Sequence, residues 1–135
     1  RAMLREVTEI ESIGDSCYNL ARTINHKYRG NEDFTEKQYS HIHQMFQLTD
    51  DALNQMVSLV EDEGHQVDVN KSFNLENEIN NYRSQLKNQN VLDVNNKEYD
   101  YQMGVHYMDI IGECEKLGDY VVNVVEACAD IKEKK

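Results

Sequence analysis

The sequence predicts an all-α fold, an antiparallel up-and-down bundle of about four helices. Two observations predict it. The 135 residues contain no proline and only six glycines, while Glu, Lys, Gln, Leu and Met recur, and this composition favours helices over strands. Apolar residues also recur with the three-and-four spacing of a helix face in separate segments along the chain. Helices with one apolar stripe each bury those stripes by packing together, and short polar connections favour antiparallel neighbours.

The first two predicted helices have clear boundary signals. A helix over residues 2–29 is expected to end at Gly30, because glycine accepts the left-handed conformation at a helix C-terminus. A second helix over residues 35–63 begins with a capping box, in which Thr35 and Gln38 each accept a hydrogen bond from the other's backbone N–H. Its periodicity predicts a buried stripe made of Ile42, Met45, Phe46, Thr49, Ala52, Leu53, Met56 and Val60.

The last two predicted helices are separated by a polar stretch. A third helix over residues 68–88 is capped by Asp68 or Asn70, and polar residues 88–97 are expected to end it. Its apolar positions are Leu75, Ile79, Tyr82 and Leu86. The fourth helix, over residues 98–132, is the longest.

A twelve-residue phrase occurs twice, in the first and the fourth predicted helix. Segments 9–20 and 113–124 both read E-x-E-x-x-G-D-x-x-x-N followed by an apolar residue, and their apolar positions coincide as well. The chain therefore contains an internal repeat at the scale of one helix. We expect the first and fourth helices to occupy equivalent places in the bundle.

Each copy of the phrase carries two carboxylates four residues apart, which project side by side from a helix. The pairs are Glu11 with Asp15 and Glu115 with Asp119. Adjacent like charges destabilise a helix slightly, and a shared hard cation would compensate for that repulsion. Alternatively, each pair marks only a solvated helix edge. Gly14 and Gly118 lie between the carboxylates and the apolar stripe, where they favour close approach of a neighbouring helix or a ligand.

Composition excludes several classes of function. The net charge of −11 argues against a nucleic-acid surface and suits cations or basic partners, although acidic surfaces also serve solubility alone. No apolar run reaches the ~20 residues of a bilayer span. The three cysteines, an odd number without zinc-ligand spacing, predict a reduced cytosolic compartment. A di-iron enzyme would need inward-facing Glu-x-x-His motifs, which the sequence lacks, so we expect no enzymatic activity.

The doubled motif resembles the signature of the PhoU family. The phrases Glu11-Ser-Ile-Gly-Asp15 and Glu115-Lys-Leu-Gly-Asp119, each followed four residues later by Asn, are similar to that family's E-R-I-G-D, with Ser12 and Lys116 in place of its Arg. PhoU-like proteins are repeats of three-helix bundles whose last helix bears the signature. The resemblance implies that residues 2–29 are the last helix of one repeat and residues 35–132 are one whole repeat.

The resemblance also implies a metal cluster of iron, zinc or manganese. Members of the family bind such clusters through E(D)-x-x-x-D pairs from the middle and last helices of a repeat. The middle-helix pair in this chain is Glu76 with Asn80, an amide where the family has Asp. The implied metal ligands are Glu11, Asp15, Glu115, Asp119 and Glu76.

Among PhoU-like chains, this form resembles the cytosolic C-terminal domain of bacterial sodium/phosphate cotransporters. The resemblance implies a non-catalytic regulatory domain of phosphate uptake, an excerpt of a longer chain tethered to the inner membrane. Its partners would be the membrane transporter domain of the same chain or phosphate-uptake proteins, and a homodimer is also open. The alternatives are a free-standing PhoU-type regulator of phosphate signalling and a structural bundle that docks a protein partner.

Overall fold

The computed structural model describes residues 2–29, 33–61 and 68–133. These residues form α1 (Ala2–Arg29), α2 (Glu36–Glu61), α3 (Asn70–Asn95) and α4 (Tyr101–Glu133), and no strand occurs among them. The predicted all-α fold is confirmed. Within the described ranges, no helix is both long and apolar enough to cross a bilayer.

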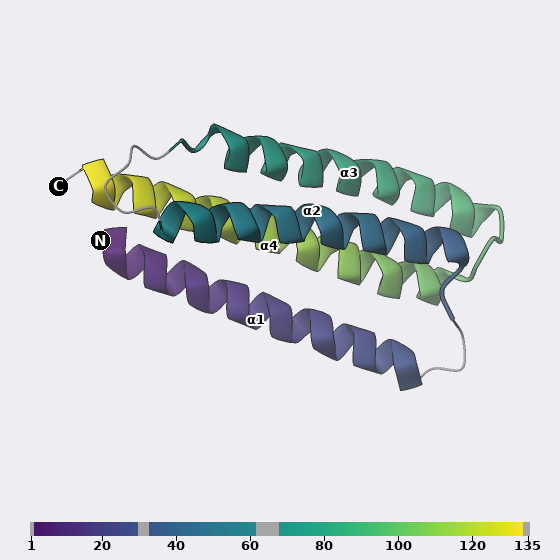
Figure 1. Ribbon diagram of the computed structural model, residues 1–135. Coiled ribbons are helices and arrows are strands. Elements are labelled where there is room, and N and C mark those ends of the chain that lie inside the picture. The colour runs from purple at the N-terminus through teal and green to yellow at the C-terminus, as the bar shows by residue number, and fades with distance from the viewer. Residues whose placement is uncertain (1, 30–32, 62–67, 134–135) are drawn as a thin grey trace.

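Successive helices run antiparallel, and the start of α1 lies at the same end of the molecule as the end of α4 (Figure 1). The helix α4 packs against all three others, and α2 and α3 also pack against each other. Among the described elements, α1 contacts only α4. The helices α2, α3 and α4 therefore form a three-helix bundle, and α1 lies along a further side of α4. The expectation that the first and fourth helices occupy equivalent places was wrong, because α4 has three neighbours and α1 has one.

The core lies around α4. Its fully buried apolar residues include Ile111, Cys114, Val121, Val124 and Val125. The helices α2 and α3 add Met45 and Ile79, which are also fully buried. A helix surrounded on three sides buries several of its faces, so α4 is apolar over more of its circumference than a helix with one neighbour needs to be.

The predicted stripes of α1 and α2 are only partly buried. On α1, Val7 and Ile10 are about half exposed and Cys17 is exposed, because no second helix covers them. On α2, the last predicted position was wrong, since Val60 is exposed and its neighbour Leu59 is buried. Sequence periodicity identifies the apolar face of a helix but not how many neighbours cover it.

The start of α2 agrees with the predicted capping box. The backbone N–H of Gln38 donates to Oγ1 of Thr35 at 3.1 Å, and the backbone N–H of Thr35 donates to Oε1 of Gln38 at 2.9 Å. The rings of Phe34 and Tyr39 also meet edge to face, with centroids 5.6 Å apart. The predicted cap at Gly30 and the end of this helix after Glu61 lie outside the described residues.

The helix α3 continues to Asn95, beyond the predicted end at residue 88. Its polar last turns are held by tertiary contacts, since buried Asp93 accepts a hydrogen bond from Gln89 at 2.9 Å and forms an ion pair with Lys37 at 3.3 Å. The helix ends where Lys97 adopts a left-handed conformation with φ of 60°. The next helix, α4, begins at Tyr101 rather than at residue 98.

Candidate functional site

Two of the predicted ligands meet between α3 and α4. Glu76 lies on α3 and Asp119 lies on α4, and these two helices pack antiparallel (Figure 1). Gly118 permits their close approach, because a Cβ atom there would lie 3.3 Å from Cδ1 of Ile79. The missing side chain at Gly118 thus helps to determine how closely the carboxylates of the two helices approach.

The carboxyl group of Asp119 lies close enough to that of Glu76 to influence its ionisation. Two ionised carboxylates at neighbouring positions repel each other, which favours the protonated form of Glu76. Burial raises the pKa of Glu76 above its ordinary value of 4.5, and the neighbouring carboxyl group of Asp119 raises it further. The side-chain amide of Asn80 opposes the rise, and the charge of Glu126 adds to it. Glu76 therefore binds a proton more readily than an isolated carboxylate does.

Arg83, which the sequence analysis did not single out, changes the role of Glu115. Its Nε atom lies 3.2 Å from Oε2 of Glu115, and both side chains are about one-third exposed. The contact is an ion pair without a hydrogen bond at Nε. Arg83 follows Glu76 by two helical turns, so it lies on the same face of α3, and that spacing was the available signal in the sequence. Glu115 is already paired with a cation of the protein.

The carboxylates of α1 lie apart from this pair. Glu11 and Asp15 are exposed, and neither makes a hydrogen bond or an ion pair with the described part of the chain. The helix α1 does not contact α3. Over residues 2–29, 33–61 and 68–133, no three His, Cys, Asp or Glu side chains are grouped so that they could hold a metal ion. The structure therefore divides the five predicted ligands rather than bringing them to one point.

Other positions of the repeated phrase join α1 to α4. The side-chain amide of Asn123 donates to Oε2 of Glu9 at 3.3 Å. The Ser16 hydroxyl lies 2.7 Å from Oε2 of Glu113 and 3.3 Å from the Glu113 carbonyl oxygen. The first Glu of each copy and the Asn of the second copy thus hold the two repeat helices together. The sequence alone does not identify these partners, because periodicity does not show which helices are neighbours.

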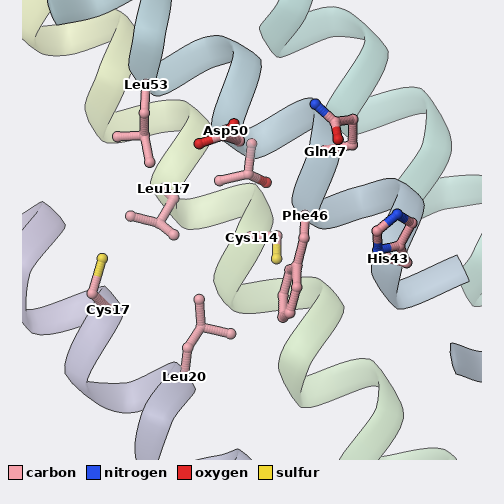
Figure 2. A pocket seen from close by; sticks show the side chains of 10 residues that line it. Cys17, Leu20, His43, Phe46, Gln47, Asp50, Leu53, Cys114 and Leu117 are labelled. Atoms are coloured by element: carbon pink, nitrogen blue, oxygen red, sulfur yellow. The ribbon is translucent and has the colours of Figure 1, made fainter.

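An open pocket of about 470 Å³ lies between α1 and α2, with α4 as its floor (Figure 2). Its lining is mostly apolar and includes Leu20, Leu53 and Leu117 from the three helices. Two cysteines, Cys17 of α1 and Cys114 of α4, also line it. Burial raises the pKa of the Cys114 thiol to about 12, so this cysteine stays protonated at neutral pH and is a poor nucleophile.

The geometry and the doubled motif agree with a comparison against known protein families, in which the model of the PhoU domain matches residues 42–128. The chain belongs to the PhoU family. No curated protein and no solved structure matches it. PhoU domains are regulatory and non-catalytic, and membership of the family indicates a role in the regulation of phosphate homeostasis.

The PhoU match covers most of the three-helix bundle and excludes all of α1. It begins in the second turn of α2, contains all of α3 and ends in α4 at Cys128. Glu76, Asp119 and the Arg83–Glu115 ion pair lie inside the match, whereas Glu11 and Asp15 lie outside it. The part of the chain that defines the PhoU domain therefore contains the carboxyl pair between α3 and α4.

Proposed function

We propose that this PhoU domain is the cytosolic regulatory part of a sodium/phosphate cotransporter and that it restrains or permits phosphate uptake without performing chemistry. The proposal rests on family membership and on the order of elements, in which one motif-bearing helix is followed by one three-helix bundle. Its partner in this proposal is a membrane transporter domain of the same chain, which would tether it to the inner membrane.

We further propose that the carboxyl pair of Glu76 and Asp119 binds one hard cation. The observation that carries this proposal is the approach of the two carboxyl groups where α3 packs closely on α4 beside Gly118, because a bound cation would remove their mutual repulsion. Asn80 follows Glu76 by one turn of α3 and would add an amide oxygen. An all-oxygen donor set suits magnesium, calcium or manganese better than softer metals.

A single ion fits this site better than the cluster that the family resemblance implies. A cluster needs several carboxylates, but Glu115 is engaged by Arg83 and the pair on α1 is separate. A guanidinium near the site also repels additional cations. The alternative outcome, which measurement of metal content distinguishes from a single ion, is a cluster of iron, zinc or manganese.

Metal content measured by plasma mass spectrometry tests the cation site. The wild-type chain is incubated with manganese, iron or zinc and then desalted, and the expected stoichiometry is about one manganese per chain. Glu76→Gln and Asp119→Asn are expected to abolish uptake, while the double variant Glu11→Gln with Asp15→Asn, which alters the separate pair on α1, is the matched control and keeps it. Uptake of two or more ions per chain that is also lost in the α1 variant would establish a cluster instead.

If the wild-type chain takes up no more metal than Asp119→Asn, the cation site is wrong. The regulatory role is tested separately, by measuring phosphate transport. Uptake of radiolabelled phosphate is measured in cells that carry the intact gene or the gene without residues 36–133. Equal uptake in phosphate-rich and phosphate-poor medium for both genes would contradict a regulatory role, and a product found only outside the membrane fraction would indicate a free-standing regulator.

A further inference from the structure

The pocket between α1 and α2 lies apart from the carboxyl pair of α3 and α4 and has no part in the proposed cation site. Its volume of about 470 Å³ falls within the range of about 300–1,000 Å³ that is usual for small-molecule sites. The pocket is present because α1 packs against α4 and, among the described elements, not against α2. A molecule held there would join two helices that do not pack together on their own.

Apolar side chains from three helices form the walls and the floor of the pocket. Leu20 comes from α1, Phe46 and Leu53 from α2, and Leu117 from α4. Figure 2 shows that these side chains surround an open space instead of filling it. Leu20, Phe46 and Leu53 are only partly buried, so an aliphatic molecule in the pocket would cover apolar surface that water contacts. The lining therefore favours an apolar body of small-molecule size.

Polar side chains lie along one edge of the pocket, on α2. His43, Gln47 and Asp50 line it from successive turns of this helix, and all three are exposed. Asp50 carries the one carboxylate among the described lining residues. The amide of Asn54 donates to that carboxylate at 3.4 Å, and Asp50 makes no ion pair with the described part of the chain. An unneutralised negative charge thus lies at the edge of an apolar space.

We propose that this pocket binds an amphiphilic amine, an aliphatic chain with a cationic head group. The aliphatic chain lies among Leu20, Phe46 and Leu117, and the ammonium group pairs with Asp50 at the edge. Charge complementarity selects this class of ligand, because an anionic head group would meet the charge of Asp50 in a chain whose net charge is −11. The bound amine contacts α1 and α2 together and so fastens α1 to the three-helix bundle.

Binding to the 135-residue chain is measured by isothermal titration calorimetry with three probes of equal chain length. Decylamine carries a cationic head group, decanol a neutral one and decanoate an anionic one, and each is used below the concentration at which it aggregates. Decylamine is expected to bind at least ~5-fold more tightly than decanoate, because attraction to Asp50 is replaced by repulsion. Decanol, which has the same chain without the charge, is expected to lie between them.

Alkylation of Cys17 shows whether the probe occupies this pocket. Cys17 is exposed and lines the pocket, so iodoacetamide should modify it readily in the free chain. Saturating decylamine is expected to slow this modification at least ~3-fold, because the bound aliphatic chain covers the thiol. The rate is followed by intact-mass spectrometry.

Matched variants test the head group and the aliphatic chain separately. Asp50→Asn is expected to weaken decylamine binding about 3-fold and to leave decanol binding unchanged. Asp51→Asn, the same change at a neighbouring position outside the described lining, is the control and should keep the wild-type affinity. Cys17→Trp fills the pocket from α1 and is expected to abolish binding of all three probes. Tyr18→Trp, at the next exposed position of α1, should not.

Four results would overturn the proposal. The first is decylamine that gives neither a binding isotherm nor protection of Cys17. The second is equal affinity for the three probes, which would mean that the pocket is apolar surface without recognition of a head group. The third is Asp50→Asn with the decylamine affinity of Asp51→Asn. The fourth is binding that survives Cys17→Trp, which would place the probe elsewhere on the chain.

Discussion

Two glycines of α4 are expected to respond in opposite directions to alanine. A Cβ atom at Gly112 would meet no atom within 4 Å. At Gly118 it would lie 3.3 Å from Cδ1 and 3.7 Å from Cγ2 of Ile79, a side chain that is fully buried. The two positions share a helix and differ in the space around them, so their comparison isolates the contact between α3 and α4.

The magnitudes follow from two opposing effects. Alanine is favoured over glycine in a helix interior by about 1 kcal/mol, and Gly112→Ala is expected to raise the free energy of unfolding by that amount. Overpacking a filled core costs about 2 kcal/mol, because fully buried Ile79 has little room to move its Cδ1 atom away from a new methyl group. Gly118→Ala is therefore expected to lower the free energy of unfolding by about 1 kcal/mol, which places the two variants about 2 kcal/mol apart.

Urea unfolding followed by far-ultraviolet circular dichroism measures both variants. A loss of about 1 kcal/mol lowers the melting temperature of a chain of this size by about 3 to 4 °C, which offers a second readout. Gly14→Ala, the equivalent change on α1, should behave like Gly112→Ala because its surroundings are also empty. Adding Ile79→Val to Gly118→Ala removes the Cδ1 atom and should recover part of the loss.

The reasoning is refuted if Gly118→Ala stabilises the protein as much as Gly112→Ala does. That result would mean that α3 lies farther from α4 than the structure places it. Because the carboxyl pair between these helices depends on the same approach, the proposed cation site would then lose its geometric basis.

Three further outcomes are expected. Because the pKa of Glu76 is raised in the folded state, its stabilising contribution is present below pH 4.5 and is lost as the pH rises through the raised value. In the presence of EDTA, Glu76→Gln should therefore gain stability relative to wild type between about pH 4 and about pH 7. An unchanged difference in urea midpoint over this range would contradict the raised pKa. Of the three thiols, only exposed Cys17 should react quickly with maleimide at neutral pH, since Cys114 and Cys128 are buried. Intact-mass spectrometry should show one adduct in the folded state and three in urea. Early labelling of two cysteines would contradict the burial of Cys114 and Cys128. Thr35→Ala removes the capping hydroxyl of α2 and should lower the free energy of unfolding by about 1 kcal/mol, whereas a change below experimental error would show that the capping box contributes little.

Local sequence signals predicted the helices well where the signal acts within one helix. The capping box at Thr35 and Gln38 is such a signal, since its two hydrogen bonds join residues three apart. The end of α3 was predicted less well, because buried Asp93 and its ion pair with Lys37 hold a polar turn helical. Local propensity favours ending the helix there, but a contact between residues far apart in sequence outweighs it.

For the candidate site, the sequence identified the carboxylates but not their partners. The repeat singled out Glu115 and Asp119, and the family resemblance added Glu76. The sequence did not show that Asp119 lies beside Glu76 or that Arg83 forms an ion pair with Glu115. Nor did it show that the equivalent carboxylates of α1 lie exposed.

The sequence by itself determined the helical class, the repeated phrase and the family signature, because these depend on residue types and on spacings within one helix. Only the tertiary structure decided which copy of the phrase is enclosed by neighbouring helices and which is open. The reason is physical: helical periodicity fixes the direction in which a side chain projects from its own axis, whereas its burial, pKa and ion pairs depend on the helices that pack beside it. Thus α1 and α4 carry the same motif. Only α4 packs against α3, which places Glu76 and Arg83 beside its carboxylates.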